Sequence, residues 1–373
     1  MSEVPSRPAP VEVLAATSKD AEEVFGVIRA AFSARPPVDP LPPALVEGLD
    51  VVRERLDLDG GLIARQDGRT VGALLFADHG RLLSLERVSV HPGVQGAGVA
   101  GRLTRAAASH ARLNGYEGLH IVARADLPQT VAFWRKQLYN VTGRTGPFLS
   151  MTRLFAVEIT TRSAEETRRL GRRLAWRLMP GDLVILTGDL GAGKTTFTQG
   201  LGEGLRVKGQ VTSPTFVISR EHRPTGDGPG LVHVDAYRLG GAPELDDLDL
   251  DTRFDEAVTV VEWGEGVAED LADARLEITI TRWRGDARPH STRGAAAGPP
   301  GEGRLGPAED APGAVDFADE AEVGDEARRF RINPVGDRWI GAGLAALARS
   351  VEDASPVVEP ARRPGAARTE RDT

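Results

Sequence analysis

Eight consecutive residues in the second half of the chain combine glycine, lysine and threonine at a spacing that suits phosphate binding. The run is Gly188-Asp-Leu-Gly191-Ala192-Gly193-Lys194-Thr195, which fits the pattern G-x-x-x-x-G-K-[ST]. The glycines allow backbone N–H groups to curve around phosphate oxygens. The lysine supplies a positive charge to the β- and γ-phosphates, and the threonine hydroxyl is placed to ligate Mg²⁺. The run therefore predicts a site for ATP and Mg²⁺.

The sequence on either side of this run supports the same interpretation. Leu183–Thr187 is an apolar stretch typical of a buried strand, and a helix is expected to follow. The first turn of that helix, which includes Thr196, adds a partial positive charge to the site. A GTPase would carry N-K-x-D and a transporter ATPase L-S-G-G-Q, and the sequence has neither. A glycine-rich turn with an incidental lysine is the ordinary alternative, which the complete motif disfavours.

Four further blocks follow the phosphate-binding run in a characteristic order. They are Ser213-Pro-Thr215-Phe216, His233-Val-Asp235-Ala-Tyr237-Arg238-Leu239, Glu244-Leu245 and Val261-Glu262-Trp263. In this order and at this spacing, the blocks resemble the TsaE family of P-loop ATPases. The resemblance covers about residues 157–350, except for a long acidic insertion that departs from the family's usual short connection.

The resemblance implies a role for each matching residue. Glu262, after the apolar stretch Val258–Val261, matches an acid associated with magnesium, so Thr195 and Glu262 are the expected metal ligands. Asp235 is expected to orient the attacking water or to support the metal. Trp263 matches a tryptophan near the nucleotide, and the loop of Ser213 and Thr215 is placed like a switch that senses the γ-phosphate. A turn-forming aspartate and a core tryptophan are the ordinary alternatives.

The family also implies a cellular task. Its members hydrolyse ATP slowly by themselves and act with the TsaB–TsaD pair in the cytoplasm. That complex transfers threonylcarbamoyl to the adenine next to the anticodon of tRNA, so contact with tRNA is expected to be indirect. A P-loop small-molecule kinase is the alternative from another class. It would need a lid rich in arginines, and Arg238 is the only arginine within the Asp235 block.

A second glycine motif lies in the first half of the chain. The run Gln95-Gly96-Ala-Gly98-Val-Ala100 follows the stretch Leu85–Pro92 and precedes a predicted helix. Backbone amides at such a strand-to-helix turn can bind a pyrophosphate. The run resembles the acetyl-CoA motif Q/R-x-x-G-x-G/A of the GNAT acetyltransferases, which implies acetyl-CoA binding at these residues.

Catalysis by this first domain is less clearly indicated than binding. Glu86 lies on the strand where many GNAT members place a general base. The usual tyrosine acid is replaced by Trp134, which cannot donate a proton usefully to a thiolate. Tyr139 follows, after a leucine where the family's helix usually ends in glycine. An acyl-CoA-binding module without catalysis is therefore the alternative, and the acetyl acceptor stays open.

The whole sequence predicts an α/β protein of two domains. We expect a GNAT-like mixed sheet with helices over 11–155 and a P-loop NTPase-like sheet with helices over 156–350. Residues 1–10, about 285–326 and 351–373 are expected to be disordered. The segment 285–326 has ten acidic and three basic residues, so it contributes 3 − 10 = −7 of the net charge of −8. The absence of cysteine excludes disulfides, and no apolar stretch is long enough to suggest a membrane span.

Hydrophobic periodicity predicts several individual elements. Helices are expected over Asp20–Phe32, over Gly98–Leu113, over Trp339–Ala348 and in a segment bearing Leu170, Leu174 and Leu178 after a capping box at Ser163 and Glu166. Strands are expected at 61–65 and 70–77 as a hairpin, and at 81–90, 119–122, 151–154, 157–160, 276–281 and 328–332.

Overall fold

The computed structural model describes residues 10–246, 248, 255–282 and 327–352. The chain divides into two compact units, and the first change of unit falls between Phe155 and Ala156. The segments expected to be disordered lie outside the described residues, except for residue 10 and residues 351–352. Along the described parts of the chain, no helix combines the length and the apolar character needed to cross a membrane.

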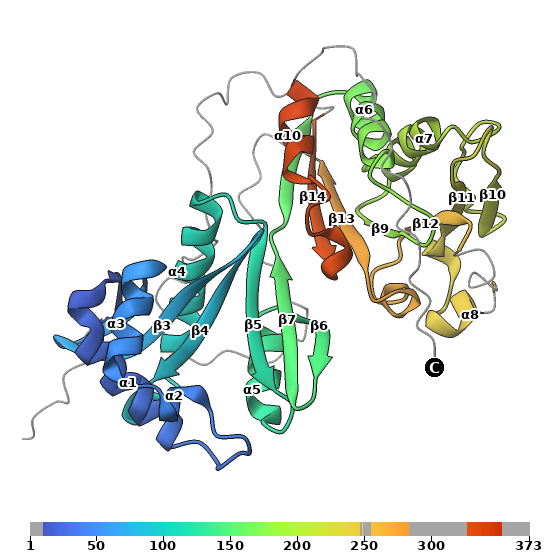
Figure 1. Ribbon diagram of the computed structural model, residues 1–373. Helices are drawn as coiled ribbons and strands as arrows, with labels where there is room; N and C mark the ends of the chain where they lie inside the picture. The colour runs from blue at the N-terminus through green and yellow to red at the C-terminus, as the bar shows by residue number, and fades with distance from the viewer. Residues whose placement is uncertain (1–9, 247, 249–254, 283–326, 353–373) are drawn as a thin grey trace, which may run out of the picture. The chain divides into compact units, whose positions relative to one another are not determined.

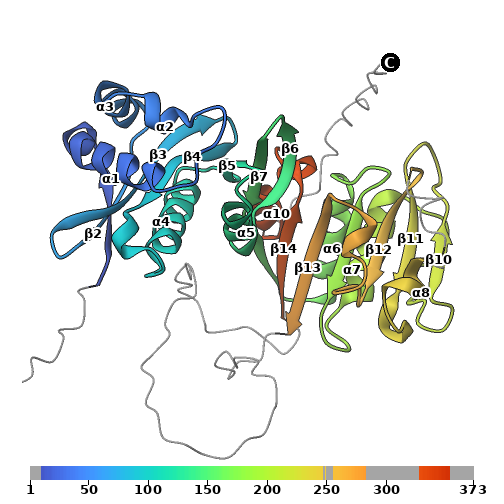
Figure 2. The same cartoon turned by 90° about the horizontal axis from the view of Figure 1, so that it is seen from below.

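The N-terminal unit is built on one mixed sheet (Figures 1 and 2). Its described strands follow the order β1-β2-β3-β4-β5-β7-β6. The strands are β1 Glu12–Ala16, β2 Gly61–Gln66, β3 Arg69–His79, β4 Leu82–Val90, β5 Gly118–Arg124, β6 Asn140–Thr145 and β7 Phe148–Leu154. The helices are α1 Ala21–Ser33, α2 Pro43–Val46, α3 Leu49–Leu58, α4 Val99–Leu113 and α5 Pro128–Lys136, with short 3₁₀ helices at Ser18–Asp20 and Pro92–Val94.

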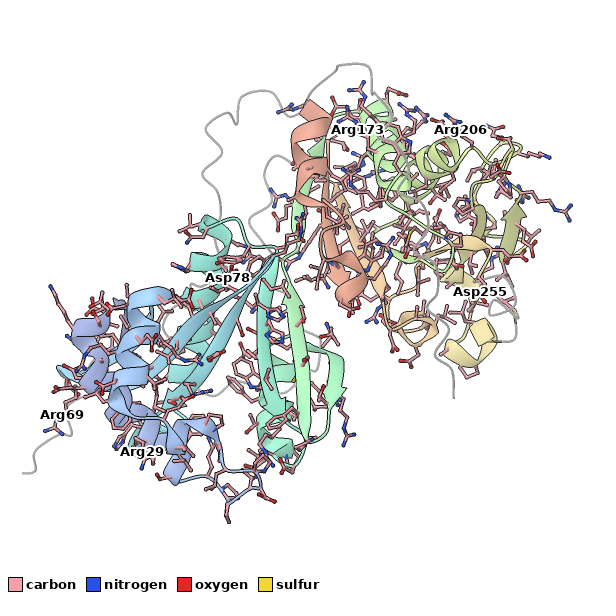
Figure 3. The ribbon with its side chains drawn as sticks, viewed as in Figure 1. Arg29, Arg69, Asp78, Arg173, Arg206 and Asp255 are labelled. Carbon is pink, nitrogen blue, oxygen red and sulfur yellow. The ribbon has the colours of Figure 1, made fainter. Side chains whose placement is uncertain are left out.

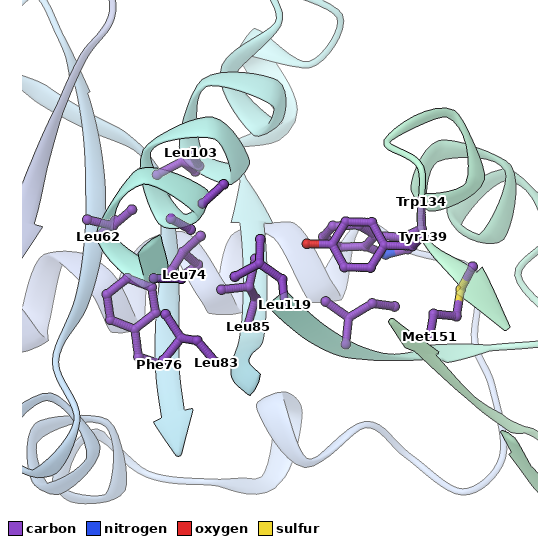
Figure 4. Close-up of a cluster of buried hydrophobic side chains, with 14 of the residues drawn as sticks. Leu62, Leu74, Phe76, Leu83, Leu85, Leu103, Leu119, Trp134, Tyr139 and Met151 are labelled. Carbon is purple, nitrogen blue, oxygen red and sulfur yellow. The ribbon is translucent and has the colours of Figure 1, made fainter. Parts of the chain in front are cut away.

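Alternating residues of the strands divide the core of this unit between two faces of the sheet. Ile63 and Leu75 pack on the face that holds α1 and α3, whereas Leu62 and Leu74 pack on the face that holds α4. Figure 4 shows the second group, in which α4 contributes Leu103. Charged side chains such as Arg29 and Arg69 lie on the outside (Figure 3). The period of two along the strands therefore produces a sheet covered on both faces.

The parallel strands β4 and β5 separate after a short paired stretch. They pair only at Leu82–Ser84 and Gly118–His120, and every other neighbouring pair in this sheet is antiparallel. Figure 1 shows the two strands diverging toward their carboxyl ends. Just beyond the paired stretch, Arg87 has φ 51° and the register with β3 shifts, which marks a bulge. The glycine motif lies in the connection that follows β4, so it is close to the end at which β4 and β5 diverge.

The C-terminal unit has a second sheet with the P-loop strand near its middle. Its described strands follow the order β10-β11-β12-β9-β13-β14-β8. The strands are β8 Val157–Thr161, β9 Leu183–Thr187, β10 Ser219–His222, β11 Gly230–Asp235, β12 Ala257–Glu262, β13 Arg275–Arg282 and β14 Arg328–Val335. The helices are α6 Ala164–Ala175, α7 Lys194–Leu205, α8 Ala242–Asp246 and α10 Ala345–Glu352, with 3₁₀ helices at Ala236–Arg238 and Glu269–Leu271. A further 3₁₀ helix, Asp337–Trp339, falls in the segment 335–341, which belongs to the first unit. Strands β11, β12, β9 and β13 are parallel.

Glycines bring the P-loop helix α7 close to α6. A Cβ atom at Gly200 would lie 2.1 Å from the carbonyl oxygen of Arg168, and one at Gly171 would lie 2.4 Å from that of Phe197. Real Cβ atoms do not approach backbone oxygens so closely, so the helix contact requires glycine at both positions. The helix that carries Lys194 and Thr195 is thus packed closely against α6 in the region of Phe197 and Gly200.

Two sequence-based expectations about helices were wrong in part. The predicted helix Trp339–Ala348 is interrupted, because Gly341 and Gly343 have φ values of 75° and 69° between the 3₁₀ helix and α10. Such backbone angles are incompatible with a continuous right-handed helix. Leu178 is buried, as its apolar character suggests, but it lies beyond the end of α6 at Ala175. The other expected elements are confirmed to within a few residues.

Candidate functional sites

The phosphate-binding run forms a loop between β9 and α7 that depends on its glycines. Gly188, Gly191 and Gly193 have φ values of 155°, 73° and 107°. These values lie in the region that L-residues with side chains rarely adopt. A Cβ atom at Gly188 would also lie 2.4 Å from the carbonyl oxygen of Ile280 on β13. Gly193 is the N-cap of α7, so the loop ends at the positive pole of that helix.

Lys194 is folded into this loop rather than pointing to solvent. Lys194 is only 5% exposed. The ammonium donates hydrogen bonds to the carbonyl oxygens of Gly188 and Asp189 at 2.6 and 3.1 Å. Burial lowers the pKa of Lys194, and the nearby carboxylates of Glu262 and Asp235 oppose that shift. A positive charge held inside the loop is suited to bind phosphate oxygens.

Asp235 and Glu262 end adjacent parallel strands in the same register. They are paired residues of β11 and β12, and they are 3% and 2% exposed. The Thr195 hydroxyl donates to the two carboxylate oxygens of Glu262 at 3.0 and 3.2 Å. Asp235 accepts hydrogen bonds from the hydroxyls of Ser213 and Thr215. The fold therefore brings Thr195 to Glu262 and the Ser213–Thr215 loop to Asp235, at the ends of two paired strands.

The oxygen atoms of this group suit a magnesium ion. Mg²⁺ prefers hard oxygen ligands and is usually held by one or two protein groups together with substrate phosphates. The adjacent Thr195 hydroxyl and Glu262 carboxylate fit that description. Over the described residues, no cluster of three or more His, Cys, Asp or Glu side chains could hold a metal by itself. The pair of Thr195 and Glu262 oxygens would hold the ion together with phosphate oxygens.

Trp263 places an aromatic surface directly over the lysine. The ammonium of Lys194 lies 3.8 Å from the centroid of the Trp263 ring. The tryptophan has φ 60°, and its ring is 5.3 Å from that of Tyr237. A non-glycine residue held at positive φ often marks a functional site. The geometry supports a position near the nucleotide rather than in the core, and the role itself stays a prediction.

Sequence reasoning missed two residues that contact this site. The guanidinium of Arg282, at the end of β13, donates to the carbonyl oxygen of Gly191 at 2.8 Å. His233 contacts the Glu262 carboxylate from β11. Arg282 carries no sequence signal of its own, whereas His233 was visible as part of a quoted block to which no role was given.

The second glycine motif forms an open turn at the start of α4. Gly96 and Gly98 have φ values of 84° and 77°, and Gly98 is the N-cap of the helix. A Cβ atom at either glycine would meet nothing within 4 Å. Gln95 is exposed and Ala100 is partly buried in the first turn. Unpaired N–H groups at an open helix N-terminus provide a place for an anionic group.

Glu86 lies where β4 separates from β5, but its carboxylate already has a partner. It forms an ion pair with Arg55 of α3, and its side chain is 29% exposed. The next residue, Arg87, forms an ion pair with Glu47. The contact uses the oxygen Oε2, and a carboxylate has a second oxygen that can accept a proton. The structure therefore gives Glu86 a structural contact beside its predicted role as a base.

Trp134 and Tyr139 are both buried in the core beside α5. Their rings meet edge to face with centroids 5.0 Å apart. Tyr139 is 1% exposed, and its hydroxyl has no hydrogen-bond partner among the described residues. Burial raises the pKa of Tyr139. Leu138 between them has φ 66°, a conformation that glycine adopts more readily than leucine.

We expect Tyr139→Phe to leave the free energy of unfolding unchanged or to raise it by about 1 kcal/mol. The substitution removes a buried hydroxyl that has no partner, and such a group is costly to bury. Ser84→Ala is the control, because the Ser84 hydroxyl is also buried but lies 3.1 Å from His120 Nδ1. Urea unfolding of both variants provides the comparison. A loss of stability in Tyr139→Phe larger than in Ser84→Ala would show that the tyrosine hydroxyl has a partner.

Comparison with known proteins finds a different family model for each unit. The model of the family "Threonylcarbamoyl adenosine biosynthesis protein TsaE" matches residues 161–289, and that of the acetyltransferase (GNAT) family matches residues 28–138. The TsaE protein of Streptomyces coelicolor is 47% identical over 182 residues, which are 48% of this chain and 99% of that protein. The TsaE protein of Mycobacterium tuberculosis is 50% identical over 125 residues, which are 32% of this chain and 74% of that protein.

Solved structures resemble the two units separately. The crystal structure of Bacillus subtilis YdiB is 28% identical and covers 53% of this chain and 95% of its own, with a TM-score of 0.33. The PaiA N-acetyltransferase from Thermoplasma acidophilum, solved with coenzyme A, is 16% identical and covers 39% of this chain and 99% of its own, with a TM-score of 0.35. From the sequence relatives and the family models, the chain belongs to the TsaE family through its C-terminal unit, and residues 28–138 of its N-terminal unit match the GNAT acetyltransferase family model.

Proposed function

We propose that the C-terminal domain, 156–350, binds ATP with Mg²⁺, hydrolyses it and supports threonylcarbamoyl-adenosine modification of tRNA in the cytoplasm. The observation that carries the proposal is the meeting of Lys194, Thr195 and Glu262 at the start of α7. Lys194 binds the phosphates, and Thr195 with Glu262 holds the metal, which would neutralise charge on the phosphates. Asp235 orients the attacking water, and Gly188–Thr196 with Trp263 bind the nucleotide. Membership in the TsaE family disfavours the small-molecule kinase alternative.

A pull-down combined with kinetics tests the proposed partners. The full chain should co-purify with the TsaB–TsaD pair, and that pair should change its rate of ATP hydrolysis. Contact with tRNA should depend on the pair. Nucleotide binding without any retention of TsaB or TsaD would refute the proposed partners while leaving the ATPase intact.

For the N-terminal domain, 11–155, we propose acetyl-CoA binding and N-acetyl transfer. The open turn Gln95–Ala100 at the divergent ends of β4 and β5 supports binding. Glu86 is the proposed base, although its ion pair with Arg55 and the burial of Trp134 favour the inactive acyl-CoA-binding module more than the sequence alone did. Release of free thiol from acetyl-CoA with N-terminal peptides as acceptors tests transfer. Binding of acetyl-CoA without thiol release from any of them would support the inactive module.

We expect Glu262→Gln to raise the Mg²⁺ concentration needed for half-maximal ATP hydrolysis by about 10-fold or more, since disturbing a metal's ligand environment has effects of this size. Glutamine keeps the side-chain volume but removes the charge, so the thermal midpoint should stay close to that of the unchanged protein. The exposed Glu265→Gln is the matched control. An unaltered magnesium titration would refute the metal role of Glu262.

A further inference from the structure

His233 is a buried histidine that contacts the site through Glu262. It lies on β11, two residues before Asp235, and its side chain is 0% exposed. Its Nε2 atom is 2.9 Å from Oε1 of Glu262. Its Nδ1 atom is buried without a hydrogen-bond partner among the described residues. The Nε2 atom of His233 thus contacts Glu262.

These contacts define which ring nitrogen carries the proton. An ionised carboxylate only accepts hydrogen bonds, so Nε2 must carry the hydrogen that it donates to Glu262. A second proton on Nδ1 would be a buried donor without an acceptor, which is unfavourable. The neutral tautomer with hydrogen on Nε2 therefore fits the surroundings of His233. It supplies a donor and no net charge.

The carboxylate of Glu262 is held from two different elements. In the described structure its hydrogen-bond partners are the Thr195 hydroxyl of α7 and Nε2 of His233 on β11. The threonine is the residue expected to ligate the metal, and its hydroxyl could direct a lone pair at the ion while its hydrogen still points to Glu262. His233 comes from β11, which pairs with β10 on one side and with β12 on the other, so its contact with Glu262 is made between neighbouring strands rather than within the loop.

We propose that His233 is a positioning residue that holds Glu262 toward Thr195, so that the metal-binding arrangement exists before the nucleotide arrives. This inference rests on the proposed role of Glu262 as a metal ligand. His233 acts only through that carboxylate. Residues that orient ligands in this way commonly change metal affinity by about 10- to 100-fold when replaced.

Three variants separate the hydrogen bond from simple packing. His233→Leu removes the donor, and His233→Asn is a polar variant whose shorter amide does not reach Glu262. His233→Gln places an amide N–H near the position of Nε2 and should restore the contact. His222→Leu is the matched control. His222 on β10 is also buried, and its Nε2 atom has no hydrogen-bond partner among the described residues, so this atom does not hold Glu262.

The primary measurement is binding of Mn²⁺ to the full chain with ADP, followed by the paramagnetic signal of the free ion. We expect His233→Leu and His233→Asn to weaken Mn²⁺ binding by about 10-fold or more. His233→Gln should lie within about 3-fold of the unchanged protein, and His222→Leu should match it, since neither disturbs a metal ligand. Affinity for ADP in EDTA should be similar in all variants, because the phosphate-binding loop is untouched. Thermal unfolding verifies that each variant is folded.

A double-variant cycle asks whether His233 acts through Glu262. In a Glu262→Gln background, adding His233→Asn should change Mn²⁺ affinity by less than about 2-fold, because the effect of a residue that acts only through another is not additive with it. Unchanged Mn²⁺ affinity in folded His233→Asn would overturn the proposal. A loss of Mn²⁺ affinity on adding His233→Asn to Glu262→Gln that equals the loss caused by His233→Asn alone would also overturn it. If the unchanged protein binds ADP and Mn²⁺ independently of each other, the proposed nucleotide–metal site itself fails instead.

Discussion

Replacing Lys194 with alanine is expected to lower the rate of ATP hydrolysis by roughly 100-fold or more, the scale of losing one fixed group that stabilises developing charge. The ammonium is buried inside the phosphate-binding loop and is held by the carbonyl oxygens of Gly188 and Asp189. Alanine removes the charge and leaves those oxygens without this donor. Nucleotide affinity should fall as well, because the phosphates lose their fixed cation. Steady-state hydrolysis and binding of a fluorescent ATP analogue measure the two effects.

Lys208→Ala is the control for the loss of a positive charge in the same unit. Lys208 is exposed after α7 and is not part of the loop. Its replacement should leave hydrolysis unchanged. If Lys194→Ala also retains both its affinity for the analogue and its rate, the assignment of the phosphate-binding loop is wrong.

Replacing Gly98 with glutamate is expected to weaken acetyl-CoA binding by at least about 100-fold, equivalent to about 2.7 kcal/mol. The substitution places a carboxylate at the N-terminus of α4, where the pyrophosphate is proposed to bind. The new carboxylate would repel the negatively charged pyrophosphate. The glutamate side chain would also fill the space that is open around Gly98. The backbone at φ 77° also becomes strained for a residue with a side chain. Calorimetry with acetyl-CoA on the full chain measures the loss.

Gly115→Glu is a control that matches both the charge and the backbone strain. Gly115 has φ 79° in open space just after the other end of α4. The variant should therefore be destabilised to a similar extent but should bind acetyl-CoA normally. No binding by the unchanged chain would refute the acyl-CoA proposal, and equal binding by Gly98→Glu would place the site elsewhere.

Local requirements of the backbone explain what could be predicted from the sequence. The glycines at 188, 191 and 193 and at 96 and 98 all have positive φ values in the structure. Each motif can therefore be recognised from a few consecutive residues, because only glycine adopts these angles without strain. The hairpin of β2 and β3 is predictable for the same reason, since Asp67 and Gly68 have φ values of 51° and 73°.

Apolar periodicity was less reliable where glycines interrupt it. The stretch Trp339–Ala348 has a helical pattern, yet Gly341 and Gly343 take positive φ values and divide it. The apolar pattern of the sequence also does not show which charged side chains form ion pairs with each other. The contact between Glu86 and Arg55 joins β4 to α3, and the sequence offers no sign of it.

By itself, the sequence determined the two glycine-rich turns, because the backbone conformation of each turn depends on a few adjacent glycines. Tertiary structure alone decided how the acidic site is assembled. Asp235 and Glu262 become neighbours through the parallel register of β11 with β12, and Thr195 meets Glu262 across 67 positions of the chain. His233 acquires its contact with Glu262 in the same way. Such contacts depend on strand order and register, which arise from the packing of the whole sheet rather than from any local run of residues.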